Sequence, residues 1–503
     1  ANARQPVISA PLRRHVRIFA SDPTLGTGLD TVARSVTTVS VAWERLAPGP
    51  VGEYLEVVDV DPASSAAYAP VALDDPYLLH EHGLFPSETD PQFHQQMVYA
   101  VAMRTIEAFE HALGRRALWS PYRDPNGTDI SGRYVQRLRI YPHALRAANA
   151  FYSPAKKALL LGYFQSPAIC DHADIARPTV FAALSHDIVA HETAHALLDG
   201  LHRRFIEPTN PDVLAFHEGF ADIVAMFLHF TLPDAVRPEI AATRGDLFTR
   251  NRLGQLAYQF GQATGQRGAL RDYIGTIDAK GHWKSRPVSI DDYHAATEAH
   301  DRGAVLVAAV FDAFLRIYEC KAKELIALAT GASGVLPPGE LSAPLVDALT
   351  IAVCKIAGRF LDIMIRALDY CPPFDITFGE YLRAVITADR DLVPDDRRAY
   401  RVAITAAFRA RGISPRDVRS VSPDTLAWET PDLHVSFKEV VDAMALDFPL
   451  DTAREEIFRR SAHNARVFHD WLVQRAPDDW LTLFGIARVA GPMNKQATAA
   501  DGT

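Results

Sequence analysis

The sequence predicts an α+β fold in which a mixed β/α region with an edge-strand sheet is followed by a mostly helical domain. Runs of β-forming residues, separated by segments rich in Pro and Gly, fill about the first seventy residues. From about Thr179 onward, apolar residues recur at helical spacing through most of the remaining chain. A cleft between the two halves is the natural place for a functional site.

The first half is expected to combine short strands with one long helix. Strands are expected at 16–19, 37–43, 54–60, 134–140 and 157–164. The helix is expected from Pro91 to Leu113, because apolar residues recur there at helical spacing and Gly114 is a typical stop.

The second half is expected to be helical. Helices are predicted at 183–199, 211–230, 303–328, 344–369, 376–389, 397–411 and 452–475. The predicted organisation is a β-rich region (1–75), an α/β half (76–230), a helical domain (231–475) and a partly disordered tail (476–503).

The composition limits the classes of partner. The net charge of −9 is spread along the chain, which argues against nucleic acid or an anionic membrane as the main partner. Charges interrupt the apolar stretch Leu345 to Leu368, so we expect no membrane span there.

Four widely spaced cysteines, with no CxxC pair, indicate free thiols. The sequence favours a cytoplasmic location, with secretion and a processed N-terminus as the alternative; it leaves the oligomeric state open.

One helical segment carries a metal-binding pattern. Residues 191–195 are His-Glu-Thr-Ala-His, an HExxH motif in a run that favours a helix. Residues four apart share one helix face, so the imidazoles of His191 and His195 can bind one ion. Glu192 lies about 100° around the helix from His191, close enough to reach a water molecule on that ion. We therefore predict His191 and His195 as metal ligands and Glu192 as a catalytic base.

A second predicted helix supplies the third ligand. Catalytic zinc usually has three protein ligands and keeps the fourth position for water. Asn210 and Pro211 are typical of a helix start, and Glu218 and Asp222 follow on one face of that helix. We predict Zn2+ as the cofactor, Glu218 as its third ligand and Asp222 as the hydrogen-bond acceptor for a ligand histidine. Other histidines crowd this region and are interpreted as packing or surface residues: His186, His202, His217 and His229.

This constellation predicts amide hydrolysis. Zinc lowers the pKa of bound water to about 7 and polarises a carbonyl group. Glu192 is expected to take the proton from that water and to deliver it to the leaving amine. The predicted function is that of a zinc-dependent peptidase.

The sequence resembles the thermolysin-type gluzincins beyond the HExxH motif. In that family an Asn-Ala-Phe-Trp edge strand lies above the metal, and here residues 149–152 are Asn-Ala-Phe-Tyr. The resemblance implies that Asn149 and Ala150 hold a peptide or protein substrate by strand addition. The resemblance is close over about residues 90–230 and loose over about residues 290–415. The departures from the family pattern imply a non-classical branch of the family.

The family also places a histidine at the start of a later helix, where it stabilises the oxyanion. His300 matches that position, although its spacing to Gly303 is one residue shorter than in the family pattern. His294 is the alternative donor. The family's tyrosine before the glutamate ligand has no counterpart near Thr209, so Tyr293 or another residue replaces it, or His300 acts alone.

Two further expectations follow from the resemblance. Asp187 matches a family position that helps to bind calcium, but its expected acidic partner is replaced by His229, so we expect the double calcium site to be absent. The arginines that could grip a substrate carbonyl or carboxylate are Arg244, Arg250, Arg271 and Arg302.

Two alternative functions remain at this point. An aminopeptidase would need an acidic residue for the free amine, usually in a Gly-x-Met-x-Asn strand, and the sequence has no such segment. A non-catalytic, zinc-stabilised peptide-binding or scaffold protein would gain nothing from Glu192, and a closed zinc site would need a fourth ligand such as Cys170 or His217.

Overall fold

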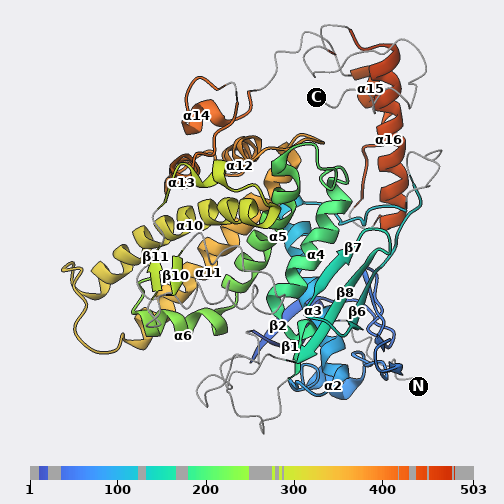
Figure 1. Ribbon diagram of the computed structural model, residues 1–503, viewed down its shortest axis with the longest axis horizontal. Helices are drawn as coiled ribbons and strands as arrows, with labels where there is room; N and C mark the ends of the chain where they lie inside the picture. The colour runs from blue at the N-terminus through green and yellow to red at the C-terminus, as the bar shows by residue number, and fades with distance from the viewer. Residues whose placement is uncertain are drawn as a thin grey trace, which may run out of the picture. The chain divides into compact units, whose positions relative to one another are not determined.

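The structure is a computed structural model in which the chain forms two compact units. It describes residues 11–20, 36–122, 132–165, 179–247, 275–277, 283–285, 288–416, 418–429, 438–449, 452–477 and 481. The first unit comprises residues 1–122 and 135–429, and the second comprises residues 123–134 and 430–503. As the sequence predicts, the fold is of the α+β class (Figure 1).

A five-stranded mixed sheet organises the first half of the large unit. Its strand order is β3-β6-β8-β7, and β9 pairs with β8. Strands β3, β6 and β8 run parallel, whereas β7 and β9 are antiparallel to β8, and β7 forms an edge of the sheet. The bounds are Leu55–Val57 for β3, Leu138–Leu145 for β6, Ala150–Ser153 for β7, Ala158–Gln165 for β8 and Thr179–Phe181 for β9.

Three further strand pairs lie outside that sheet in the described part of the chain. They are β1 (Arg13–Phe19) with β2 (Val36–Ala42), β4 (Val60–Asp61) with β5 (Ala66–Ala67), and β10 (Gly275–Ile277) with β11 (Trp283–Ser285). Each pair is antiparallel.

The long helix α3 (Pro91–Leu113) has the predicted bounds. The Asp90 side chain caps its first turn, Pro91 occupies the first helical position, and Gly114 ends it in a left-handed conformation with φ of 67°. Helix α3 contacts β1, β2 and β6 as well as α4, so it links the strands to the helical part of the unit.

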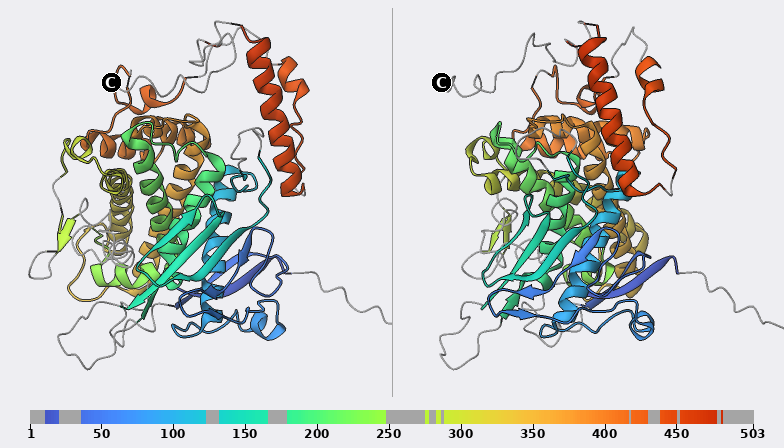
Figure 2. Two further views of the ribbon diagram at one scale, coloured as in Figure 1. Left: turned by 45° about the vertical axis from the view of Figure 1, so that its right-hand side comes forward. Right: turned by 90° about the vertical axis from the view of Figure 1, so that its right-hand side faces the viewer.

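Helices α4, α5, α10 and α11 pack in succession next to α3. Figure 2 shows the teal strands β6 to β8 beside the green helices α4 and α5 in both views. The helices of this unit are α2 (Pro76–His80), α4 (His186–Leu201), α5 (Pro211–Phe230), α6 (Pro233–Thr243), α9 (Asp292–Ala295), α10 (Ala299–Ala329), α11 (Ala343–Arg366), α12 (Phe378–Leu392), α13 (Tyr400–Ala410) and α14 (Pro423–Leu426). One continuous apolar core, from Val16 to Ala427, joins them to the sheet.

Helices α5 and α10 cross in backbone contact at two glycines. A Cβ atom on Gly219 would lie 2.7 Å from the carbonyl oxygen of Gly303, and one on Gly303 would lie 2.7 Å from the carbonyl oxygen of Ala215. Any larger residue would therefore force the helices apart. Glu218 directly precedes one of these glycines, and His300 lies three residues before the other. The crossing thus sets the distance between these two side chains.

The second unit contains α15 (Lys438–Ala443) and α16 (Arg454–Gln474). Its small apolar core consists of Val440, Trp471, Ala476 and Leu481. The Asn464 side chain on α16 forms two hydrogen bonds with the backbone of Ala445: its Nδ2 donates to the carbonyl oxygen, and its Oδ1 accepts from the N–H group. These bonds tie α16 to the segment just after α15.

Several predicted bounds differ from the structure. The strand predicted at 134–140 begins at Leu138, and the strand predicted at 54–60 divides into β3 and β4. Residues 182–184 form a 3-10 turn, and α4 begins only at His186 because the Ser185 side chain caps the helix there. The predicted domain boundaries at 75, 230 and 475 stay predictions, and most of the predicted partly disordered tail, including 482–503, lies outside the described residues.

Candidate metal centre

Helix α4 presents the two histidines of the HExxH motif on one buried face. The rings of His191 and His195 lie 4.4 Å apart between centroids and nearly perpendicular to each other. Both residues are buried, as is Glu192 between them. The one-turn spacing therefore produces the predicted convergence of two imidazoles.

Glu218 on α5 completes a three-residue group. Its Oε2 atom lies 3.6 Å from His191 Nε2 and 3.7 Å from His195 Nε2. These distances exceed the range of a hydrogen bond, so the three atoms surround a space rather than bond directly to one another. Within the part of the chain that the structure describes, His191, His195 and Glu218 form one of two groups that could hold a metal ion. The structure does not show the identity of that ion.

The outer nitrogen of each histidine has its own partner. His191 Nδ1 lies 2.9 Å from Asp222 Oδ1, which places Asp222 where the sequence predicts it. His195 Nδ1 lies 2.6 Å from His217 Nδ1. Burial opposes a positive charge on His191, but the contacts with Asp222 and Glu218 raise its pKa well above the ordinary value. The group is therefore electrostatically suited to a cation.

Glu192 is anchored to the edge strand. Its Oε2 atom accepts a hydrogen bond of 2.7 Å from the backbone N–H of Tyr152 in β7. The Tyr152 hydroxyl donates to Asp199, which also forms a buried ion pair of 3.2 Å with Lys157. Because Asp199 lies two turns after His191 on α4, these contacts align β7 along the helix that carries the metal ligands.

The outward edge of β7 faces the same side as Glu192. In an antiparallel ladder, alternate residues direct their N–H and C=O groups toward the partner strand or away from it. Tyr152 directs its N–H toward Glu192 and hence away from β8, so Ala150, two residues earlier, has the same orientation. The chain approaches β8 closely just before β7, because a Cβ atom on Gly162 would lie 2.5 Å from the carbonyl oxygen of Asn149.

A cavity of about 430 Å³ joins the edge strand to the candidate metal centre. Its walls come from β7, α4, α5, the segment between those helices and the start of α10. The lining residues are Asn149, Ala150, Phe151, Tyr152, Pro154, His191, Glu192, His195, Ile206, Leu214, His217, Glu218, Ala299 and His300. The predicted ligands, the predicted base and the two residues predicted to hold the substrate backbone, Asn149 and Ala150, thus line one cavity.

His300 lies at the start of α10 beside Glu218. Its Nε2 atom is 3.5 Å from Glu218 Oε2, and its Nδ1 atom is 2.9 Å from Glu298 Oε1. Burial opposes the charged form, but Glu298 and Glu218 together raise the pKa of His300 above its ordinary value. His294, the alternative donor, is exposed and does not line the cavity.

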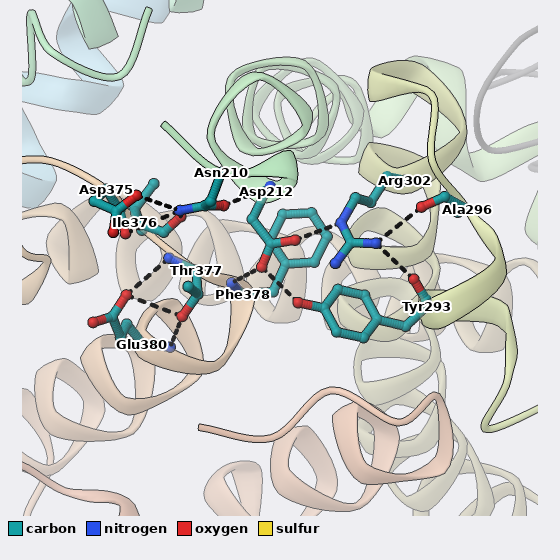
Figure 3. Close-up of polar contacts among 10 residues, drawn as sticks. All are labelled: Asn210, Asp212, Tyr293, Ala296, Arg302, Asp375, Ile376, Thr377, Phe378 and Glu380. Carbon is teal, nitrogen blue, oxygen red and sulfur yellow. Dashed lines mark hydrogen bonds and ion pairs between the residues drawn. The ribbon is translucent and has the colours of Figure 1, made fainter. Parts of the chain in front are cut away.

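Figure 3 shows that Tyr293 and Arg302 belong to a different network. The Tyr293 hydroxyl donates to Asp212 Oδ2 at 2.6 Å, and Arg302 Nε donates to Asp212 Oδ1. Asp212 also accepts from the backbone N–H of Phe378 at 2.8 Å. This network joins the first turns of α5, α10 and α12 and so ties together the helices that carry Glu218 and His300, whereas neither Tyr293 nor Arg302 lines the cavity.

Of the other arginines named from the sequence, Arg244 does not line the cavity either. Arg244 donates to the carbonyl group of Pro337 in another part of the unit. Arg250, Arg271 and Cys170 lie outside the described residues. His217 contacts the outer nitrogen of His195, so it is not placed as a fourth ligand.

The second group that could hold a metal ion consists of His186, Asp187 and His229. His186 Nδ1 and His229 Nδ1 lie 3.0 and 2.8 Å from the same Asp187 Oδ1 atom. Burial alone would raise the pKa of Asp187, but the two histidines hold it well below its usual range. From the sequence, His229 was expected only to replace the acidic calcium partner of Asp187, and both His186 and His229 were interpreted as packing or surface residues, because no one-turn spacing links the three residues.

Three other functional contacts were missed from the sequence: His217 with His195, Tyr152 with Glu192, and Glu298 with His300. The only local signal was for Glu298, because an acidic residue just before a helix is a typical cap, and Glu298 does cap α10.

Comparisons with known proteins add no family assignment. A scan against models of protein families and a search of curated protein sequences found no match. Among the described residues, α5 is long and apolar enough to cross a membrane by length and composition. However, 78% of its most apolar stretch is buried inside the structure, as in the core helix of a globular protein.

Proposed function

We propose that the protein is a zinc-dependent peptidase of the gluzincin type. The observation that carries the proposal is the single cavity that contains His191, His195 and Glu218, the base Glu192 and the outward edge of β7. A metal group alone would fit a structural site. The outward edge of β7, which pairs with no other strand among the described residues, supplies a template for an extended peptide, which a structural site does not need.

Zinc suits the donor set better than a harder ion. Two neutral imidazoles and one carboxylate are typical ligands of catalytic zinc, whereas calcium and magnesium prefer oxygen ligands. Ligands placed tetrahedrally around zinc are about 3.3 Å apart, close to the 3.6 and 3.7 Å found between Glu218 and the two histidines. When bound, zinc would activate a water molecule and polarise the scissile carbonyl group.

Residues that line the cavity are assigned to proton transfer, substrate binding and stabilisation of the oxyanion. Glu192 Oε2 accepts the hydrogen bond from the Tyr152 N–H. We therefore assign Glu192 Oε1 to take the proton from water and to pass it to the leaving amine. Ala150 offers its outward backbone groups to the substrate, and Asn149 lies beside it. His300, oriented by Glu298, donates its Nε2–H to the developing oxyanion.

The cavity walls favour an endopeptidase or oligopeptidase over an aminopeptidase. Among the described residues that line the cavity, the carboxylates are Glu192 and Glu218, and both have roles in the zinc centre. No further acidic group is present there to hold a free amine. We keep cytoplasmic location and a peptide or protein partner as predictions.

Mass spectrometry of a digested peptide mixture tests the proposal. The wild type with zinc is expected to cut internal peptide bonds, and Glu192→Gln is expected to lower the rate about 10²- to 10⁴-fold, the usual contribution of a general base. The variant should keep its zinc, because Glu192 is not a ligand. Cuts only at N-termini would support an aminopeptidase. Wild-type protein that holds zinc but cuts nothing would support a binding protein, and full activity in Glu192→Gln would refute the mechanism.

A further inference from the structure

The two ligand histidines are supported by different kinds of group. His191 Nδ1 faces the Asp222 carboxylate, whereas His195 Nδ1 faces a third imidazole, that of His217. The centroids of the His217 and His195 rings lie 4.7 Å apart and their planes are 30° apart, so the two rings meet edge to edge through their Nδ1 atoms. His217 is buried, and it directly precedes Glu218 on α5. It therefore touches the candidate centre without offering a ligand atom to it.

The contact between His195 and His217 limits where their protons can lie. Two nitrogen atoms 2.6 Å apart must share one proton. If His195 uses Nε2 to bind an ion, its proton must be on Nδ1, where it is donated to His217 Nδ1. His217 then carries its own proton on Nε2. His217 Nε2 is buried and has no hydrogen-bond partner among the described residues, so no described group requires it to act as an acceptor instead.

We infer that His217 is a positioning residue for the metal centre: its Nδ1 accepts the Nδ1–H of His195 and so fixes the tautomer and ring orientation with which His195 binds zinc. This inference rests on the proposed zinc site and deepens it. Outer partners of this kind make the ligand more basic and hold its ring in place. The imidazole of His217 thus does for His195 what the carboxylate of Asp222 does for His191.

Variants at position 217 separate this role from simple packing. The side-chain oxygen of Asn occupies about the position of a histidine Nδ1, so His217→Asn keeps an acceptor next to His195. The side-chain oxygen of Gln lies near the position of Nε2, so His217→Gln keeps polarity and size but moves the acceptor. His217→Leu removes the acceptor altogether. His202→Leu is the matched control, because it makes the same change at a histidine that packs on the Phe205 ring and does not line the cavity.

Competition with a zinc chelator at fixed pH gives the dissociation constant of each variant. We expect His217→Leu and His217→Gln to bind zinc about 10- to 100-fold more weakly than the wild type, the usual effect of losing an outer partner. His217→Asn and His202→Leu should stay near the wild-type value. Imidazole ¹⁵N spectra of histidine-labelled protein with zinc should show His217 protonated at Nε2, and its signals are assigned from the His217→Asn spectrum.

Three results would overturn the inference. His217→Leu could bind zinc as tightly as the wild type, or His217→Gln could bind it as tightly as His217→Asn. The spectrum could also show His217 protonated at Nδ1. If His217→Leu does not fold, the comparison of Asn with Gln decides. Wild-type protein that binds no zinc would instead refute the proposed function, whereas equal binding by all variants would refute only the role of His217.

Discussion

Helices α4 and α5 carry two groups of two histidines and one carboxylate, and these groups differ in their spacing. In the first, Glu218 lies 3.6 and 3.7 Å from the histidine nitrogens. In the second, Asp187 lies 2.8 and 3.0 Å from His229 and His186, which are hydrogen-bond distances. The first group surrounds a space beside a cavity, whereas the second closes on itself.

The ligand types alone therefore do not distinguish the proposed zinc site from a hydrogen-bonded group. Both groups have donors that suit a transition metal. Of the two, the first has an outer partner beside each Nδ1, each Nε2 near the carboxylate, and a further carboxylate, that of Glu192, in the same cavity. In the second group, the Nδ1 atoms of both histidines contact the Asp187 carboxylate at hydrogen-bond distance. An Nδ1–H proton can therefore lie between each histidine and the carboxylate, where a metal ion would otherwise have to bind. We therefore expect the second group to act as a hydrogen-bonded staple between α4 and α5.

The largest expected effect separates the two groups by zinc content. Glu218→Ala removes a ligand, so zinc affinity should fall by more than the 10- to 100-fold typical of an outer partner. His229→Leu should keep one zinc ion per chain. Elemental analysis of the purified variants after dialysis measures both.

The wild type serves as the control, with one ion per chain expected. Two ions in the wild type, one of them lost in His229→Leu, would show that the second group is also a metal site and would remove the distinction drawn from the distances.

The second expected effect concerns stability. Asp187→Asn removes the charge that accepts hydrogen bonds from His186 and His229, so the free energy of unfolding should fall by about 3 kcal/mol, the upper end for hydrogen bonds to a charged group. Urea denaturation followed by circular dichroism measures this loss. Zinc content should not change, and an Asp187→Asn variant as stable as the wild type would argue against the staple.

The smallest expected effect is a dependence of stability on pH. Burial lowers the pKa of His186 to about 4 in the folded protein, whereas an unfolded histidine titrates near 6.5. Between these values the unfolded state binds the additional proton, so the free energy of unfolding falls as the pH decreases. From pH 7 to pH 5 this one group should contribute about 2 kcal/mol.

His186→Gln isolates that contribution, because all other titrating groups remain. Denaturation midpoints at pH 7 and pH 5 should differ less in this variant than in the wild type. An identical difference in the two proteins would mean that His186 is not held neutral in the folded state.

Much of the fold could be predicted because its signals are local. The bounds of α3 and α5 match the prediction, since Asp90 and Asn210 cap them and a proline follows each cap. Bounds in the strands were less accurate. The turn between β3 and β4 and the late start of β6 depend on pairing with strands far away in the sequence, which local β propensity does not record.

Local sequence was enough to place His191 and His195 on one helix face, because helical geometry links residues four apart wherever a helix forms. It also predicted Glu218 and Asp222 as one set, whereas the edge strand at Asn149 and Ala150 was implied by the family resemblance, and the strand begins at Ala150. The contacts between groups on different elements depend on the tertiary structure. The crossing of α5 and α10 at Gly219 and Gly303 brings His300 to Glu218, and the packing of β7 on α4 brings Tyr152 to Glu192. Such contacts join residues 40 or more positions apart, and no short-range periodicity encodes them.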